Sequence, residues 1–167
     1  MVLPLGLLAC TTAAHPDASR LRNMPVVVTY ALAPAASIKE GVTAVTDSGK
    51  VLFSPSSQRS FNESINAYSG GLNGSLPRWV RVTWRTGADI DLDTTNGRWK
   101  GGTIAGDYTV NVLKRIPDDV LAFASARHGR AIVLRFRLKD DGVLFSWDVQ
   151  EAGKFGGWVY LMHGGDF

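Results

Sequence analysis

The sequence has almost none of the residues on which most catalytic and metal sites depend. Its 167 residues include one cysteine and three histidines. A single thiol cannot form an internal disulfide, and no Cys/His cluster remains to build a structural zinc site. The chain also lacks a Gly-x-Ser-x-Gly elbow, a Gly-x-x-x-x-Gly-Lys phosphate loop and a His-Glu-x-x-His motif. We therefore expect a domain that is not an enzyme, holds no cofactor or metal, and is stabilised by packing alone.

The chain also lacks a large excess of positive or negative charge. The chain has 18 Lys and Arg against 15 Asp and Glu, a formal net charge of +3, and the basic residues are scattered among acidic ones. Nucleic-acid binding needs a clustered basic surface, so the sequence gives it no support. Apolar residues make up 45% of the chain, which is enough for one hydrophobic core at this length. We expect a single globular domain.

The N-terminus carries an apolar run that ends in the only cysteine. Residues 1–9 read M-V-L-P-L-G-L-L-A, which is too short to span a bilayer and is typical of the end of a signal peptide. Leu7-Leu8-Ala9-Cys10 resembles the lipobox of bacterial lipoproteins, in which the cysteine is lipidated and becomes the new N-terminus. No Lys or Arg precedes the run, so we expect a truncated signal. The alternative is a buried N-terminal strand with an ordinary core cysteine.

The lipobox resemblance implies a simple layout for the rest of the chain. Residues 10–24 have no repeating apolar face and are predicted to be a tether between the lipidated Cys10 and a folded body at 25–167. The acyl chains would be the only membrane contact. Since lipoproteins held at the inner membrane commonly carry Asp after the cysteine, Thr11 implies the periplasmic side of the outer membrane.

Most of the body alternates apolar and polar residues with period two, the pattern of half-buried antiparallel strands. One helix is predicted between Pro117 and Gly129, because proline and acidic residues open it and basic residues and glycine close it. The pattern predicts a mainly β (α+β) fold, an antiparallel β-sandwich or curved sheet with one packed α-helix. Strands are expected at 26–30, at 38–46 and 50–54 around a turn, weakly at 61–68, and at 158–162.

Two hairpins can be given a register. In the first, a turn at 86–88 would place Arg85 opposite Asp89 and Trp84 opposite Ile90, with an Arg/Asp ladder on the other face that also pairs Arg81 with Asp93. In the second, Asp141-Gly142 is a favoured two-residue turn. The resulting pairs are Leu138–Phe145, Phe136–Trp147, Leu134–Val149 and Arg135–Asp148. Both hairpins place Trp84 and Trp147 in the core.

The candidate binding residues are acidic and aromatic. Asp89, Asp91 and Asp93 would form an acidic stripe along a strand, since alternate residues point the same way. Three interpretations remain open: the Arg/Asp ladder, a patch for a basic protein partner, and a metal site. A calcium loop is excluded because Thr94 and Lys100 stand where Gly and Glu are required. Trp79 and Trp99 fall on polar faces or loops beside basic residues, as interface hot spots often do.

Part of the body, residues 76–150, is similar to small periplasmic immunity lipoproteins. The similarity rests on the segments Leu76–Trp84, Ile116–Asp119, Ile132–Leu134 and Gly142–Phe145. Some of those proteins neutralise phospholipase effectors of type VI secretion, so the resemblance implies direct binding to a secreted phospholipase. The contact residues would be Trp79, Asp89, Asp91, Asp93 and Trp99. The alternative is a structural or assembly lipoprotein of an envelope complex; a hydrolase using His128 or His163 is the least favoured class.

Overall fold

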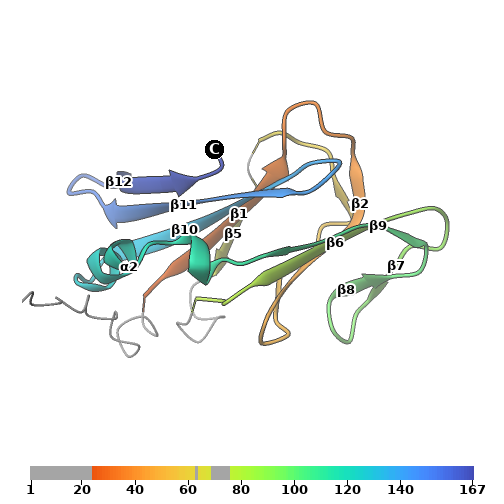
Figure 1. The fold of residues 1–167 in the computed structure, drawn as a ribbon, viewed down its shortest axis with the longest axis horizontal. Coiled ribbons are helices and arrows are strands. Elements are labelled where there is room, and N and C mark those ends of the chain that lie inside the picture. The colour runs from red at the N-terminus through yellow and green to blue at the C-terminus, as the bar shows by residue number, and fades with distance from the viewer. Residues whose placement is uncertain (1–23, 63, 69–75) are drawn as a thin grey trace, which may run out of the picture.

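The structure is a computed structural model that describes residues 24–62, 64–68 and 76–167 (Figure 1). The expected signal at 1–9, Cys10 and the tether up to residue 23 lie outside the described residues. Met24, the last residue of the expected tether, is 5% exposed and belongs to the hydrophobic core. The fold is mainly β with one α-helix, as the alternating pattern predicted.

The first sheet has five strands in the order β12-β11-β10-β1-β5. Its central strand pair, β1 and β10, is parallel, whereas every other pair in it is antiparallel. β1 and β10 are rich in Val, Ile and Leu because the core covers one of their faces. The strands are β1 (Val26–Leu32), β5 (Ser64–Tyr68), β10 (Arg130–Leu138), β11 (Val143–Ala152) and β12 (Trp158–Gly165).

The second sheet has the strand order β3-β2-β6-β9, and β4 also pairs with β2. All of its pairs are antiparallel. A separate two-stranded hairpin, β7 with β8, stands beside it at the right of Figure 1. The strands are β2 (Lys39–Thr46), β3 (Val51–Phe53), β4 (Ser57–Gln58), β6 (Val80–Thr86), β7 (Asp91–Asp93), β8 (Arg98–Lys100) and β9 (Thr103–Val110). The expected hairpin around residues 47–49 is confirmed as β2–β3.

The predicted helix is confirmed as α2 (Asp118–Ser125), which begins after Pro117 and carries two acidic residues in its first turn. A short 3₁₀ helix, η1 (Leu113–Arg115), connects it to β9. Val120, Leu121 and Ala124 are buried on the side of α2 that faces the core. The fixed φ of Pro117 and the two carboxylates near the positive end of the helix dipole favour a helix that starts here.

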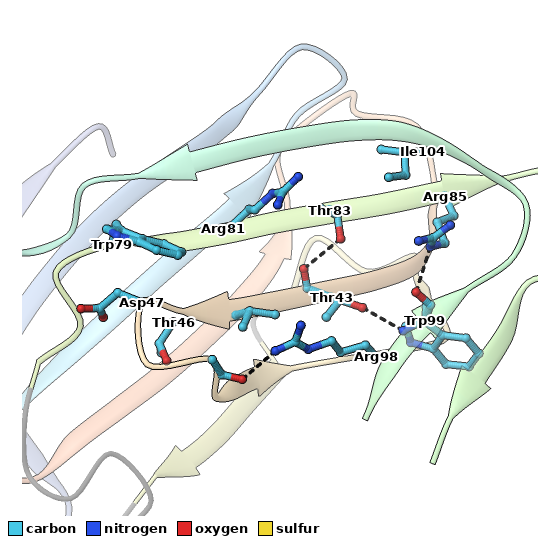
Figure 2. Close-up of a pocket in the computed structure, with 12 residues that line it drawn as sticks. Thr43, Thr46, Asp47, Trp79, Arg81, Thr83, Arg85, Arg98, Trp99 and Ile104 are labelled. Carbon is cyan, nitrogen blue, oxygen red and sulfur yellow. Dashed lines mark hydrogen bonds between the residues drawn. The ribbon is translucent and has the colours of Figure 1, made fainter. Parts of the chain in front are cut away.

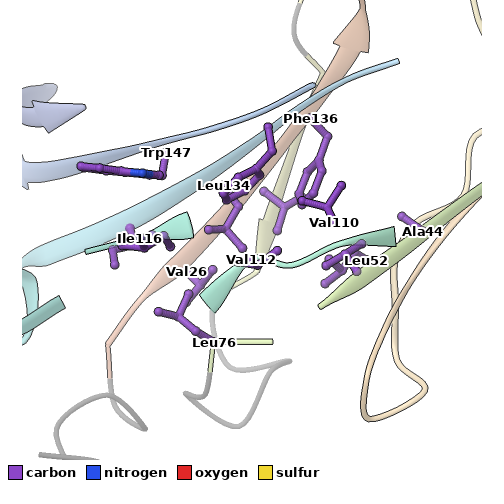
Figure 3. Packing of buried hydrophobic residues seen from close by; sticks show 14 of the residues in the cluster. Val26, Ala44, Leu52, Leu76, Val110, Val112, Ile116, Leu134, Phe136 and Trp147 are labelled. Atoms are coloured by element: carbon purple, nitrogen blue, oxygen red, sulfur yellow. The ribbon is translucent and has the colours of Figure 1, made fainter. Parts of the chain in front are cut away.

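One apolar core lies between the two sheets (Figure 3). Aromatic rings connect the sheets directly: Phe53 of β3 stacks on Tyr30 of β1 at 4.4 Å between ring centroids and packs against Phe136 of β10 at 5.8 Å. Trp84 and Trp147 are 4% and 5% exposed, which confirms their prediction as core residues.

The register predicted for the first hairpin is wrong. β6 pairs with β2 on one side and with β9 on the other, so Trp84 lies opposite Gly106 rather than Ile90, and Arg85 lies opposite Ile104 rather than Asp89. The Arg/Asp ladder therefore does not form. Arg81 instead forms an ion pair with Asp107 of β9.

The second hairpin, β10–β11, is confirmed as a strand pair, but its register is displaced by two residues. Phe136 lies opposite Phe145, and Leu138 lies opposite Val143. The turn therefore lies one residue earlier than predicted, and Lys139 donates its main-chain N–H to Gly142 O at 2.9 Å across Asp140 and Asp141. A shift of two leaves every side chain on its predicted face, because the side-chain period of a strand is two.

Candidate ligand-binding groove

A groove of about 380 Å³ runs along the outer face of the second sheet (Figure 2). β2 and β6 form its floor, because their outward residues alternate with the apolar residues that enter the core. We call it the arginine groove and define it by Thr43, Trp79, Arg81, Arg85, Arg98 and Trp99. Its size is at the lower end of the range for small-ligand pockets, about 300–1,000 Å³.

The β7–β8 hairpin forms one wall of this groove. The Trp99 main-chain N–H donates to Thr43 Oγ1 of β2 at 3.1 Å, and its indole Nε1–H donates to Ser54 O at 3.1 Å. Arg98 Nη2 donates to Gly49 O in the β2–β3 turn at 2.8 Å. These bonds connect the hairpin to two neighbouring segments, so the position of Trp99 is fixed by main-chain and side-chain groups together.

Glycine permits the close approach of the hairpin to β2. Gly41 has φ +51°, and a Cβ there would lie 2.9 Å from Ile90 Cγ2. Gly101, which follows β8, has φ +74°, and a Cβ there would lie 1.8 Å from Asp89 O. Both positions require a backbone conformation that is accessible mainly to glycine. Gly41 leaves room for Ile90 and Trp99 beside β2, and Gly101 lets the chain close against Asp89 at the base of the hairpin.

The charge of the arginine groove is positive. Arg81, Arg85 and Arg98 line it against one carboxylate, Asp47, which Arg78 binds through Nε at 2.7 Å. Arg81 is neutralised by Asp107, and this ion pair lowers the pKa of the Asp107 carboxyl and raises the pKa of Arg81. Arg85 and Arg98 differ, since their hydrogen-bond partners in the described chain are main-chain carbonyls.

The structure brings together two of the five residues predicted to contact a partner. Trp79 stands before β6 and Trp99 lies on β8; both are half-buried and line the arginine groove. Asp89, Asp91 and Asp93 do not line it.

Each of the three aspartates has a local role in the hairpin. Asp89 adopts a positive φ of 62° in the turn before β7. Asp91 is exposed and lies 3.8 Å from Lys100 Nζ across the hairpin. Asp93 accepts hydrogen bonds from the Thr95 hydroxyl and main-chain N–H, which lower the pKa of its carboxyl. The three aspartates therefore serve turn formation and pairing within the hairpin.

Sequence reasoning missed Thr43, Arg85 and Arg98. The alternation of Arg81, Thr83 and Arg85 correctly indicated a polar strand face. The predicted ladder with the aspartates would neutralise the positive charge of this face. The strand pairing that directs the Arg85 side chain to the carbonyls of Trp99 and Gly101 depends on contacts distant in sequence, and the local pattern carries no signal for them.

A second exposed surface lies on β12, the edge strand of the first sheet. Trp158, Val159 and Tyr160 are each more than half exposed. No Asp, Glu, Lys or Arg occurs between residues 155 and 165. This patch is apolar, whereas the arginine groove combines aromatic rings with charged donors, a composition typical of specific sites.

No known protein family, curated protein or solved structure matches this chain. Within residues 24–62, 64–68 and 76–167, no group of three His, Cys, Asp or Glu side chains could hold a metal ion. In the same described residues, no helix is long and apolar enough to cross a membrane.

Proposed function

We propose that this protein is a lipid-anchored binding protein that neutralises a secreted phospholipase toxin by direct contact and has no catalytic activity of its own. The observation that supports it is the arginine groove, which presents Trp79 and Trp99 beside arginines on the face of a packed sheet. Tryptophan and arginine are the residues most enriched at interface hot spots.

The groove is suited to binding because its side chains are held in place before a partner arrives. Trp99 is fixed by two hydrogen bonds, and Arg85 donates Nε to Trp99 O at 2.9 Å. Side chains that are already ordered lose less conformational entropy on association, which favours affinity. A rigid, partly apolar surface of this kind serves recognition without any movement of the fold.

The proposed anchor is Cys10, which lies outside the described residues. Lipidation there would hold the folded body at the periplasmic side of the outer membrane, since multiple acyl chains make the attachment effectively permanent. A phospholipase acting on that membrane would meet the binding domain at its substrate surface. Neutralisation would follow from covering the entrance to the active site of the toxin or from holding its lid shut.

The hairpin beside the groove extends the proposed contact surface. Asp89 and Asp91 are exposed on it, and Asp93 is partly exposed. In this arrangement Trp79 and Trp99 are the anchors at the centre, and the aspartates form a polar rim. Rim charges affect association rates more than they affect affinity.

The experiment searches the genes that neighbour this one for a phospholipase effector and uses that effector in an inhibition assay; a neighbourhood without such a gene would count against the proposal. Trp79→Ala and Trp99→Ala should each weaken the complex by about 2 kcal/mol, or roughly 30-fold in Kd, as expected for hot-spot residues. Trp158→Ala is the matched control, because Trp158 is 55% exposed on β12, away from the groove. Phospholipid hydrolysis and Kd are measured together.

Two results would contradict the proposal. If the effector neither binds nor is inhibited, the neutralising role is wrong, and recovery of envelope-assembly proteins with the lipidated protein would then favour the assembly alternative. If the effector is inhibited but Trp158→Ala weakens the complex as much as the groove variants do, the contact surface has been placed on the wrong face.

A further inference from the structure

We propose that the arginine groove is a carboxylate-binding site, which accepts acidic side chains from an extended segment of the partner protein between Arg85 and Arg98. This inference rests on the proposed function and specifies the chemistry of its partner. It reverses the charge that the sequence suggested for the interface, because the groove offers cations where an acidic stripe was expected.

The first argument is the balance of charge. Of the three arginines in the groove, Arg81 pairs with Asp107, and within residues 24–62, 64–68 and 76–167 Arg85 and Arg98 form no ion pair. Asp47 at the far end is bound by Arg78. Glu40 lies opposite Arg85 in the β2–β6 register, yet within the described residues these two side chains form no ion pair. In the described part of the chain, two guanidinium groups therefore line the groove with neutral carbonyl partners, and a ligand with carboxylates would complement them.

The second argument is the geometry of the donors. A guanidinium has five N–H donors in a planar fork that matches a carboxylate. Arg85 uses Nε and one Nη for the carbonyls of Trp99 and Gly101, and Arg98 uses one Nη for Gly49 O. These bonds orient both forks and leave further donors on each for a ligand. Arginines tied to carbonyls in this way are held in place without being neutralised.

The third argument is the surrounding surface. Trp79 and Trp99 stand at opposite ends of the groove in Figure 2, and the floor between them carries threonines. The rings reduce access of water, which strengthens charge-assisted hydrogen bonds beside them. The volume of about 380 Å³ admits a few side-chain ends of an extended segment. The groove therefore fits an acidic peptide strand better than a bulky aromatic cofactor.

The test uses ¹⁵N NMR of the folded domain with three probes: a blocked hexaglutamate peptide, a blocked hexaglutamine peptide and inorganic phosphate. Hexaglutamate should shift the Nε–H signals of Arg85 and Arg98 and the indole signals of Trp79 and Trp99, and raising the salt should weaken its binding. Hexaglutamine should leave these signals unchanged. The double variant Arg85→Gln/Arg98→Gln should lower the affinity for hexaglutamate at least tenfold.

The control variant is Arg127→Gln. Arg127 is exposed after α2, at the other end of the molecule from the hairpin, and pairs with Glu151 at 3.0 Å. Because Arg85 also binds the carbonyls of the hairpin, Arg98→Gln alone is tested as well, and the dispersion of the amide spectrum reports folding. If Arg98→Gln is folded and binds hexaglutamate like wild type, the inference is wrong.

The outcomes separate this inference from the proposed function. Equal binding of the two peptides, or shifts with phosphate and none with hexaglutamate, would overturn the assignment to an acidic protein segment. Loss of peptide binding with full inhibition of the phospholipase would support the carboxylate site and contradict the groove as the toxin interface. Loss of both in the groove variants, with neither lost in Arg127→Gln, supports both proposals.

Discussion

Gly106→Ala tests the strand pairing on which the arginine groove is built. Gly106 of β9 lies opposite Trp84 of β6, and a Cβ there would come within 2.1, 2.2 and 2.6 Å of three atoms of the indole ring. The ring has little freedom to move. It stacks on Tyr108 at 5.2 Å between centroids, and the Lys39 ammonium lies 5.4 Å from its centroid.

The expected cost follows from two opposing effects. Inserting a methyl group into a packed core costs about 1–3 kcal/mol, and the upper end applies here because the clash is with a rigid ring. Replacing glycine by alanine recovers about 0.7 kcal/mol by restricting the unfolded chain. Gly106→Ala should therefore lower the free energy of unfolding by about 2 kcal/mol and the Tm by roughly 4–8 °C for a domain of this size.

Urea unfolding, monitored by tryptophan fluorescence, measures this change as a shift of the urea concentration at the unfolding midpoint, with an unchanged dependence of the unfolding free energy on urea concentration. Gly142→Ala is the matched control, because a Cβ at Gly142 meets nothing within 4 Å, and its effect should stay within about 0.5 kcal/mol. If Gly106→Ala is as neutral as the control, Trp84 does not cover Gly106. The β6–β9 register would then be refuted, together with the groove floor derived from it.

Three further changes test contacts on either side of the core. The Asp140 carboxyl accepts a hydrogen bond from the buried Lys39 ammonium, and this bond is the main reason that the pKa of Asp140 falls from 3.8 to about 2. The stability that the pair contributes is therefore present above pH 4 and is lost as the pH falls towards 2. The stability gap between wild type and Lys39→Met should narrow over that range, and a constant gap would exclude the pair as its source. Asp148→Asn should cost about 2 kcal/mol in urea unfolding, since it breaks a largely buried pair with Arg135; a change under 0.5 kcal/mol would contradict this. Thr43→Val removes the acceptor of a β8 amide and should speed hydrogen exchange of that amide about fivefold, with no change expected at β11 amides.

The sequence was sufficient to predict most of the strands because burial imposes a period of two on them, but it gave no expectation of β8 or β9. It could not set the β10–β11 register, because a displacement of two residues preserves both faces and leaves the apolar pattern unchanged. The observed connection places Asp140 where it binds Lys39 and the Ser37 hydroxyl. Those partners lie more than 100 residues away in the chain. The observed turn therefore goes with a tertiary ion pair and departs from the local Asp141-Gly142 preference.

The error in the first hairpin has a similar cause and a larger consequence. The segments of β7 and β9 both follow β6 closely enough in the chain to pair with it. The predicted register used the segment of β7, which is nearer and whose apolar residues alternate in phase with those of β6. In the structure β9 takes that position, and the glycine at 106 makes room for the Trp84 ring. This pairing frees the β7–β8 hairpin to fold over β2, which a hairpin partner of β6 could not do.

The candidate site was predictable only in its aromatic part. Trp79 and Trp99 were predicted because exposed tryptophans beside arginines are typical of interface hot spots, and both line the groove. The sequence could not predict the sign of the charge of the groove, because that sign depends on which carboxylates reach which guanidinium groups in the fold. Asp107 reaches Arg81, whereas Asp93 turns back to Thr95 in its own loop.

The distribution of the core explains how such a surface could vary without loss of the fold. The hydrophobic core cluster and the residues packed against it include no member between Trp84 and Tyr108. The segment between them contains β7, β8 and two of the three groove arginines, Arg85 and Arg98. Substitutions there alter the charge and shape of the groove while the residues that bury most apolar area are untouched. A binding surface arranged in this way can change with its partner, provided that Gly41 continues to leave room for the hairpin beside β2 and Gly101 for its closure on Asp89.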